Sequence, residues 1–318
     1  MNRSDIFIDN LSYALGDQSV TVESSVDAGR TLTSKEAFID AGFRQHWMAN
    51  PSTTAYDLAV RAVAPIKNQL EGLGTIIYST CLTLNGNNGS WSDFTATRDV
   101  KHLLDYPASH LQSYLQAPNA NVIGLNQQAC TSVLGSIRIA RALLLTEPSL
   151  EKILCVSADR FPENAIYEQA YNLISDGASA FTVSRKPTGY RVLGSAALTN
   201  GALAQASDDE TVGTYFNFTH QVITKAAANS GIDIRDIDWV IPQNTNMKAW
   251  QILARVLGIP FTKICCQTLG DVGHIISSDN IVNLVHLANS GAIKSGDRLL
   301  LCMAGYGLNW QATIIEKC

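Results

Sequence analysis

The chain has few charged residues and no cluster of either sign. Only 16% of its 318 residues are charged, the formal net charge is −5, and lysines and arginines do not gather in one stretch. Nucleic-acid-binding proteins need a dense basic surface to neutralise phosphates, so the sequence argues against that class. An acidic partner would also need a local basic patch, and none is visible in the sequence.

Long apolar runs are missing as well. No stretch approaches the roughly 18–20 uninterrupted apolar residues of a membrane-spanning helix, and the first residues, MNRSDIFIDN, lack the apolar run of a signal peptide. The sequence therefore predicts a globular, cytoplasmic protein with no membrane partner. With 46% hydrophobic residues, the chain can bury a large core, either as one big domain or as two fused halves.

Cysteines are present, but not at the spacings that hold metals or build disulfide frameworks. The seven are scattered without a CxxC or Cys/His pattern, so neither a zinc site nor a set of structural disulfides is indicated. Motifs for a redox or nucleotide cofactor are also missing. Reduced thiols that only fill space are expected at six positions: Cys81, Cys155, Cys265, Cys266, Cys302 and Cys318.

The sequence does contain two successive series of strands and helices. Apolar strands such as KILCVSADR and RLLLCMA alternate with helical patterns over residues 51–70, 212–229 and 247–259. A short strand is predicted at 262–268, and residues 85–119 form a weakly periodic, aromatic segment that we interpret as a lid or an interface. Strands that are apolar throughout fit sheets covered on both faces, so a duplicated α/β architecture is expected.

Cys130 stands apart from the other cysteines. It lies within NVIGLNQQACTSVLGSIRIARALLL (121–145), where an apolar strand, interpreted as buried, passes into a helix. At a helix start, free backbone N–H groups and the positive end of the helix dipole favour a thiolate and lower the pKa of a thiol. Cys130 is therefore a candidate nucleophile.

Four motifs follow one another along the chain: QQACTSVLGSIRIA, ISDGASAF, DWVIPQNTNMKAW and MAGYGLNW. Together with the chain length, they resemble the 3-oxoacyl-[acyl-carrier-protein] synthase III (KAS III) family of the thiolase fold. The resemblance implies an α/β protein of two fused βαβαβαββ halves with a five-layered αβαβα core. Residues 1–185 would hold the nucleophile and a lid insertion, and residues 186–318 a histidine, an acid and a glycine-rich turn.

The same resemblance has implications for partners and substrates. It implies a homodimer, and a cysteine that takes its acyl group from a thioester of acyl-carrier-protein phosphopantetheine or of coenzyme A. These thioesters would be substrates, so no bound cofactor and no metal are expected. The acceptor of the acyl group would be a small molecule.

Two positions depart from the family pattern. Condensing members carry histidine in a P-H-Q-A-N segment and asparagine in a G-N-T segment, whereas this chain has Gln243 at the first position and His274 at the second. In the family, those two residues hydrogen-bond the malonyl thioester oxygen and stabilise the enolate that forms as carbon dioxide leaves. Gln243 could still donate one such bond, but the usual pair of donors is missing.

Two carboxylates lie close to His274 in the sequence, Asp271 before it and Asp279 after it. With Cys130, either one gives the composition of a Cys–His–Asp site, in which histidine takes a proton from the incoming nucleophile and the carboxylate holds its tautomer. We prefer Asp279 as the orienting acid. Its alternative role is that of a helix cap, because Ser277, Asp279 and their neighbours are favourable N-cap residues.

The resemblance also places the groups that bind the oxyanion and the substrate. Backbone N–H groups of Cys130 and of the Gly305-Tyr306-Gly307 turn would bind the oxyanion. The family has glycine at all three positions of this turn, so Tyr306 would narrow the site or add a hydroxyl near the acyl group. Gln243 and Asn246 complete the predicted substrate-contacting set.

These residues predict an acyltransferase of EC 2.3.1 type that works without decarboxylation, through an acyl-enzyme on Cys130. Specialised-metabolite biosynthesis is the expected setting. Two alternatives stay open: a decarboxylative, C–C-forming 3-oxoacyl synthase with a rearranged His/Asn site, and a non-catalytic subunit of a heterodimeric ketosynthase. The sequence does not identify the acyl group, the acceptor, or whether a carrier protein or coenzyme A is the donor.

Overall fold

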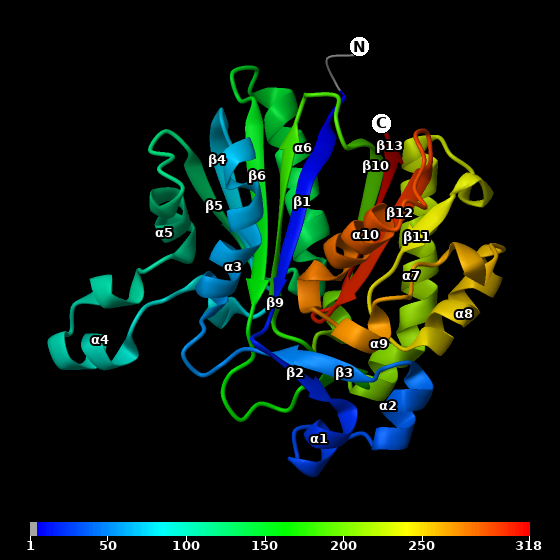
Figure 1. Ribbon diagram of the computed structural model, residues 1–318, viewed down its shortest axis with the longest axis horizontal. Coiled ribbons are helices and arrows are strands. Elements are labelled where there is room, and N and C mark those ends of the chain that lie inside the picture. Colours follow the sequence, from blue (N-terminus) through cyan, green and yellow to red (C-terminus); the bar gives the residue numbers. More distant parts are fainter. Residues whose placement is uncertain (1–4) are drawn as a thin grey trace.

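The computed structural model describes residues 5–318 (Figure 1). Residues 1–4, which belong to the predicted N-terminal half, lie outside the described residues. Nine strands form one sheet in the order β11-β12-β13-β10-β1-β9-β6-β4-β5. Their bounds are β1 Phe7–Leu15, β4 Leu73–Ser79, β5 Asn121–Leu125, β6 Lys152–Asp159, β9 Gly177–Ser184, β10 Tyr190–Thr199, β11 Trp239–Ile241, β12 Arg298–Gly305 and β13 Asn309–Lys317.

This sheet consists of two half-sheets with the same strand order. In the N-terminal half the chain runs β1, α3, β4, α5, β5, α6, β6, β9, and in the C-terminal half it runs β10, α7, β11, α8, α10, β12, β13. Ile264 adds a single parallel bridge to Val240 of β11, at the place that β5 occupies beside β4. The half-sheets join where β1 pairs with β10 at Phe7↔Arg191 and Ile8↔Tyr190.

Helices cover both faces of each half-sheet (Figure 1). In the middle layer, α6 (Ser132–Thr146) and α10 (Asp279–Asn289) pack between the half-sheets. On the outer faces, α3 (Ala55–Val63) and α5 (Pro107–Tyr114) cover the N-terminal half, while α7 (Asp208–Ser230) and α8 (Met247–Leu257) cover the C-terminal half. These are the five layers αβαβα of the thiolase fold, so the predicted fold class is confirmed. The division into residues 1–185 and 186–318 stays a prediction.

The middle layer holds the largest apolar core. On α6, Val133, Leu134, Ile137 and Leu144 are buried between the two half-sheets, and truncating such a residue to alanine typically costs about 2–5 kcal/mol. The stretch Ala129–Thr146 is apolar and long enough to span a membrane, but 61% of it is buried within the protein. This pattern is typical of the core helix of a globular protein. A cytoplasmic location stays a prediction.

The outer and central helices begin differently. Capping boxes start α3 at Thr54 and Asp57 and α7 at Ser207 and Glu210. In contrast, within residues 5–318 no side chain forms an N-cap hydrogen bond to α6 or α10. The N-termini of the two central helices therefore keep backbone N–H groups for partners other than a cap.

Two local predictions differ from the structure. Strand β5 was expected to be buried, but it is an edge strand with Val122 39% exposed. The strand predicted at 262–268 is reduced to the Ile264 bridge, because the N–H of Cys266 turns back to the Ile264 carbonyl. The polar region after β1 contains strands β2 (Gln18–Thr21) and β3 (Gln45–Met48) and helices α1 (Val22–Asp27) and α2 (Lys35–Ala41).

Residues 82–119 form an arm on the N-terminal half. Its helix α4 (Trp91–Thr97) projects from the body of the protein beside α5 (Figure 1). Trp91 is 71% exposed and therefore is not part of the core. The remaining short elements, β7 (Glu168–Gln169), β8 (Asn172–Leu173) and α9 (Leu269–Val272), lie in loops near the ends of the strands.

Candidate active site

Cys130 lies in a 3₁₀ turn, Ala129–Thr131, directly before α6. Ala129 has φ 46°, a left-handed conformation that is uncommon for residues other than glycine and that sets a sharp entry to the helix. A Cβ on Gly305 would lie only 2.8 Å from the backbone N of Cys130, so this position needs glycine. The buried thiol thus stands at a helix start, with the β12 end packed against its backbone.

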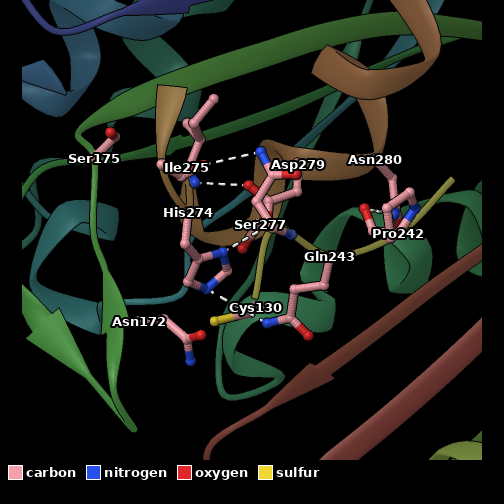
Figure 2. A network of polar contacts seen from close by, with 12 residues as sticks. Cys130, Asn172, Ser175, Pro242, Gln243, His274, Ile275, Ser277, Asp279 and Asn280 are labelled. Carbon is pink, nitrogen blue, oxygen red and sulfur yellow. Dashed lines mark hydrogen bonds and ion pairs between the residues drawn. The ribbon is translucent and has the colours of Figure 1, made fainter. Parts of the chain in front are cut away.

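His274 and Asp279 come from the loop before α10 and from its first turn. Nδ1 of His274 donates to Oδ2 of Asp279 at 2.5 Å (Figure 2). The same carboxylate accepts the backbone N–H groups of Ile275 at 2.6 Å and of Asn244 at 2.7 Å. Three donors therefore fix the fully buried carboxylate, and the carboxylate fixes the imidazole with Nε2 directed toward Cys130 (Figure 2).

A tight turn brings Asp279 back to the histidine. On a straight α-helix, residues five positions apart point in different directions, but a 3₁₀ turn over Ile276–Ser278 separates the two residues here. Ile276 has φ 46°, an outlier for a β-branched residue. The Ser277 hydroxyl donates to the Ala129 carbonyl at 3.3 Å, which ties this turn to the turn that holds the nucleophile.

Asp271, the alternative acid, lies elsewhere. Its carboxylate pairs with Arg44 at 2.6 Å, and its side chain is 59% exposed. Its backbone carbonyl accepts hydrogen bonds from the side chains of Gln45 and Trp47. Of the two carboxylates near His274 in the sequence, Asp279 is the one that contacts the imidazole.

Gln243, at the position where condensing relatives carry histidine, is held by the backbone of β12. Its Oε1 accepts the Ala304 N–H at 2.9 Å, and its Nε2 donates to the Ala304 carbonyl at 3.0 Å. The same Nε2 lies 3.4 Å from Nε2 of His274. One amide hydrogen of Gln243 therefore remains for the region around the imidazole.

Cys130 and His274 have pKa values shifted in opposite directions. A hydrogen bond with Cys81 lowers the pKa of Cys130; burial opposes this, and His274 lowers it further, to about 6. Burial lowers the pKa of His274, but the Asp279 carboxylate outweighs burial and raises it to about 10. Both shifts favour a thiolate–imidazolium pair.

A cavity of about 60 Å³ opens on this pair. Five predicted residues line it, namely Cys130, His274, Gln243, Gly305 and Tyr306. The Tyr306 ring forms part of the wall, but its hydroxyl bonds Asp208 at the start of α7 instead of pointing at the acyl site. Of the two functions predicted for this side chain, the structure favours narrowing the site.

Two residues of the predicted oxyanion- and substrate-binding set lie outside this lining. Asn246 caps α8 through the N–H of Lys248 at 2.9 Å. Gly307, with φ 102°, makes the turn between β12 and β13. Both have a structural function where the sequence predicted substrate contact. Among residues 5–318, no group of three His, Cys, Asp or Glu side chains is placed to hold a metal ion.

Sequence reasoning missed two neighbours of the nucleophile. Asn172 lines the same cavity and lies beside Cys130 in Figure 2; it begins the two-residue strand β8, which is too short to show a periodic pattern. Cys81 was expected to be inert, yet its Sγ is 3.8 Å from Sγ of Cys130. Its position directly after β4 was the available signal, because the carboxyl ends of parallel strands gather functional groups.

Comparisons with known proteins agree with this geometry. Residues 126–201 match the family model 3-oxoacyl-[acyl-carrier-protein (ACP)] synthase III, and residues 227–317 match the model of its C-terminal part. A beta-ketoacyl-[acyl-carrier-protein] synthase III from Rhizorhabdus wittichii is 25% identical over 317 residues, which is 92% of this chain and 94% of that relative. One from Chlamydia caviae is 28% identical over 218 residues, 59% of this chain and 64% of the relative.

Solved structures give the same fold. A structure named as the acyltransferase ChlB3 is 22% identical, covers 98% of both chains and has a TM-score of 0.83. At this identity the similarity establishes the fold, while the family is established by the sequence matches over both halves. The chain therefore belongs to the KAS III-like family of thiolase-fold transferases.

Proposed function

We propose that this chain is an acyltransferase that carries an acyl group on Cys130 and passes it to a small-molecule alcohol, amine or other acceptor without decarboxylation. The observation that carries the proposal is the line of groups Cys130, His274 and Asp279 in one buried site (Figure 2). A nucleophile, a base within reach and an acid that orients the base are the parts of covalent acyl transfer. The acyltransferase name of the structural neighbour ChlB3 supports the same reading.

The first step loads the enzyme. The Cys130 thiolate attacks the carbonyl carbon of a carrier-protein or coenzyme A thioester, and the bond from that carbon to the donor sulfur breaks. The imidazolium of His274 gives its Nε2 proton to the departing thiolate. Backbone N–H groups at Cys130 and at the turn after Gly305 would stabilise the oxyanion, which is usually the largest single contribution in such chemistry.

The second step delivers the acyl group. Neutral His274 takes the proton of the acceptor O–H or N–H at Nε2, while the acceptor oxygen or nitrogen attacks the thioester on Cys130. The cysteine leaves as a thiolate, and the resting ion pair is restored. Asp279 keeps the proton on Nδ1 throughout, and general base catalysis of this kind contributes about 10²–10⁴-fold.

A second candidate is decarboxylative carbon–carbon bond formation. It is favoured by a pair of neighbouring N–H donors, because Nε2 of Gln243 and Nε2 of His274 lie 3.4 Å apart and condensation needs two donors to the malonyl thioester oxygen. It is disfavoured by the fixed position of the Gln243 amide, which bonds Ala304 through both its oxygen and its nitrogen. Release of carbon dioxide from a malonyl thioester, dependent on Cys130, distinguishes condensation from simple transfer.

Specialised-metabolite assembly, where acyl groups are transferred to small molecules, is the setting that we propose.

We also infer that the chain forms a homodimer through the arm and strand β5. This side of the N-terminal half carries exposed apolar side chains on adjoining elements: Leu84, Trp91, Val100, Leu104, Tyr106 and Val122. An unpaired edge strand beside an apolar surface is a ready site for another chain. Light scattering should give a mass near twice the 34.4 kDa of one chain.

Intact-protein mass spectrometry tests the proposed function directly. The purified chain is mixed with short, branched, aromatic and aminoacyl thioesters, next to Cys130→Ala and to Cys302→Ala, which removes another buried thiol. A mass gain in wild type and Cys302→Ala, but not in Cys130→Ala, is expected. A chase with acceptors or with malonyl thioester then separates transfer from condensation. Failure of every donor to load would favour the non-catalytic subunit instead.

A further inference from the structure

A second thiol lies next to the nucleophile. Sγ of Cys81 is 3.8 Å from Sγ of Cys130, although the two residues come from different elements, the end of β4 and the start of α6. Cys81 is half-buried and Cys130 is buried. A thiol is a weak donor, but a thiolate is a good acceptor because of its charge. Cys81 is not one of the three residues, Cys130, His274 and Asp279, on which the proposed function rests.

A buried carboxylate holds Cys81 in this place. Asp159, at the end of β6, accepts the backbone N–H of Cys81 at 3.0 and 2.9 Å through its two oxygens. It also accepts the N–H of Leu82 at 3.0 Å and the side-chain amide of Asn85 at 3.1 Å. The chain is thus fixed immediately past β4, so the thiol cannot easily leave the nucleophile.

Charges from several elements act on this pair of thiols. The titratable groups are His274 before α10, Asp279 on α10, Asp159 on β6 and Tyr306 after β12. The imidazolium favours a thiolate at Cys130, whereas the carboxylates oppose it. The hydrogen bond with Cys130 raises the pKa of Cys81, and burial raises it further, so Cys81 keeps its proton and remains a donor.

From this geometry we infer that Cys81 is a positioning residue for the proposed acyl transfer: its S–H donates a hydrogen bond to the Cys130 thiolate and holds the nucleophile at the cavity. The inference rests on the proposed function and deepens it. During loading, the bond keeps the sulfur charged and in place beside His274. During delivery, it stabilises the same sulfur as it leaves the acyl carbon, because the charge returns to Cys130 at that moment.

The test measures the charge of Cys130 without any acyl substrate. Alkylation of Cys130 by iodoacetamide is followed from about pH 5 to about pH 9 under reducing conditions, because the thiolate is the reactive form. Peptide mapping assigns the label to Cys130 and not to Cys81. Wild type is compared with Cys81→Ala, with Cys81→Ser, whose hydroxyl can still donate, and with Cys302→Ala as the control for loss of a buried thiol. Thermal melts confirm that each variant is folded.

In Cys81→Ala, we expect the alkylation midpoint to move up by about one pH unit, which is a tenfold loss of thiolate below the midpoint. Cys81→Ser should restore at least half of this shift, and Cys302→Ala should match wild type. A folded Cys81→Ala with an unshifted midpoint would overturn the inference, even if acyl transfer succeeds. A shifted midpoint in a protein that loads no thioester would leave the Cys81 contact established and refute the acyltransferase function alone.

Discussion

The helices α6 and α10 occupy the same place in the two halves of the protein, yet they present different groups to the site. Neither has a side-chain N-cap among the described residues, and both have an anionic group at their N-terminal end. On α10 the Asp279 carboxylate is saturated by three hydrogen-bond donors. Directly before α6, the Cys130 sulfur contacts the neighbouring thiol and the imidazole, and it opens on the cavity.

The difference explains how one repeated fold gives both a fixed acid and a reactive nucleophile. A helix start favours an anion in either half, but the surroundings decide what that anion does. The Asp279 carboxylate accepts hydrogen bonds from two backbone N–H groups, so it stays in place and orients His274. The Cys130 thiolate faces a proton on His274 that is transferred during the reaction, so the sulfur remains available for attack. Breaking the contacts at one helix and then at the other tests this comparison.

The largest expected effect comes from Asp279→Asn, which keeps the shape of the side chain at α10 and removes its charge. The amide cannot accept from all three present donors, and it no longer favours the Nδ1–H tautomer of His274. We expect acyl transfer to fall by about 10²–10³-fold, and the free energy of unfolding to fall by about 1–3 kcal/mol. Single-turnover chase of the acyl-enzyme and denaturant titration measure the two effects. A folded variant with the wild-type rate would show that Asp279 is only structural.

A smaller effect is expected from pH, acting on the α6 side of the comparison. The pKa of Cys130 is lowered to about 6, so the thiolate is present above that pH and is lost as pH falls through it. The pKa of His274 is raised to about 10, so its Nε2 proton is available below that pH and is lost above it. The loading rate should therefore be level between these values. It should fall tenfold per pH unit below about 6.

Stopped-flow loading at fixed ionic strength measures this profile, with a hydrolysis blank for the thioester at each pH. An acid limb near 9, the ordinary pKa of a cysteine thiol, would contradict the ion pair. If the acid limb lies near pH 6 in wild type and moves to higher pH in Cys81→Ala, the pH profile depends on the contact between Cys81 and Cys130.

The main site residues could be predicted from sequence because each lies in a short motif. Cys130 stands at a strand-to-helix junction, and His274 replaces a family asparagine in a recognisable segment. Asp279 was preferred over Asp271, but helix spacing could not decide between them. What decided the geometry was the left-handed Ile276 in the turn between the two residues, which no periodic pattern could show.

The residues that were missed reach the site through tertiary contacts. Cys81 meets Cys130 because β4 ends and α6 begins at the same edge of the sheet, and Asn172 comes from the two-residue strand β8, which is too short to show a pattern. Exposure of β5 was also missed, since an apolar strand has the same composition whether a neighbouring strand or another chain covers it. Local pattern predicts elements and their ends, but not which ends meet.

The smallest expected effect is that of Asp271→Asn, the matched control for Asp279→Asn. Both substitutions remove one negative charge near His274 in the sequence, but Asp271 is 59% exposed on its side chain and pairs with an Arg44 that is also exposed. Such ion pairs contribute about 0–1 kcal/mol, because water screens them. The transfer rate should stay within about twofold of wild type. If Asp271→Asn lowered transfer as much as Asp279→Asn, the effect would stem from local negative charge and not from the hydrogen bond at the start of α10.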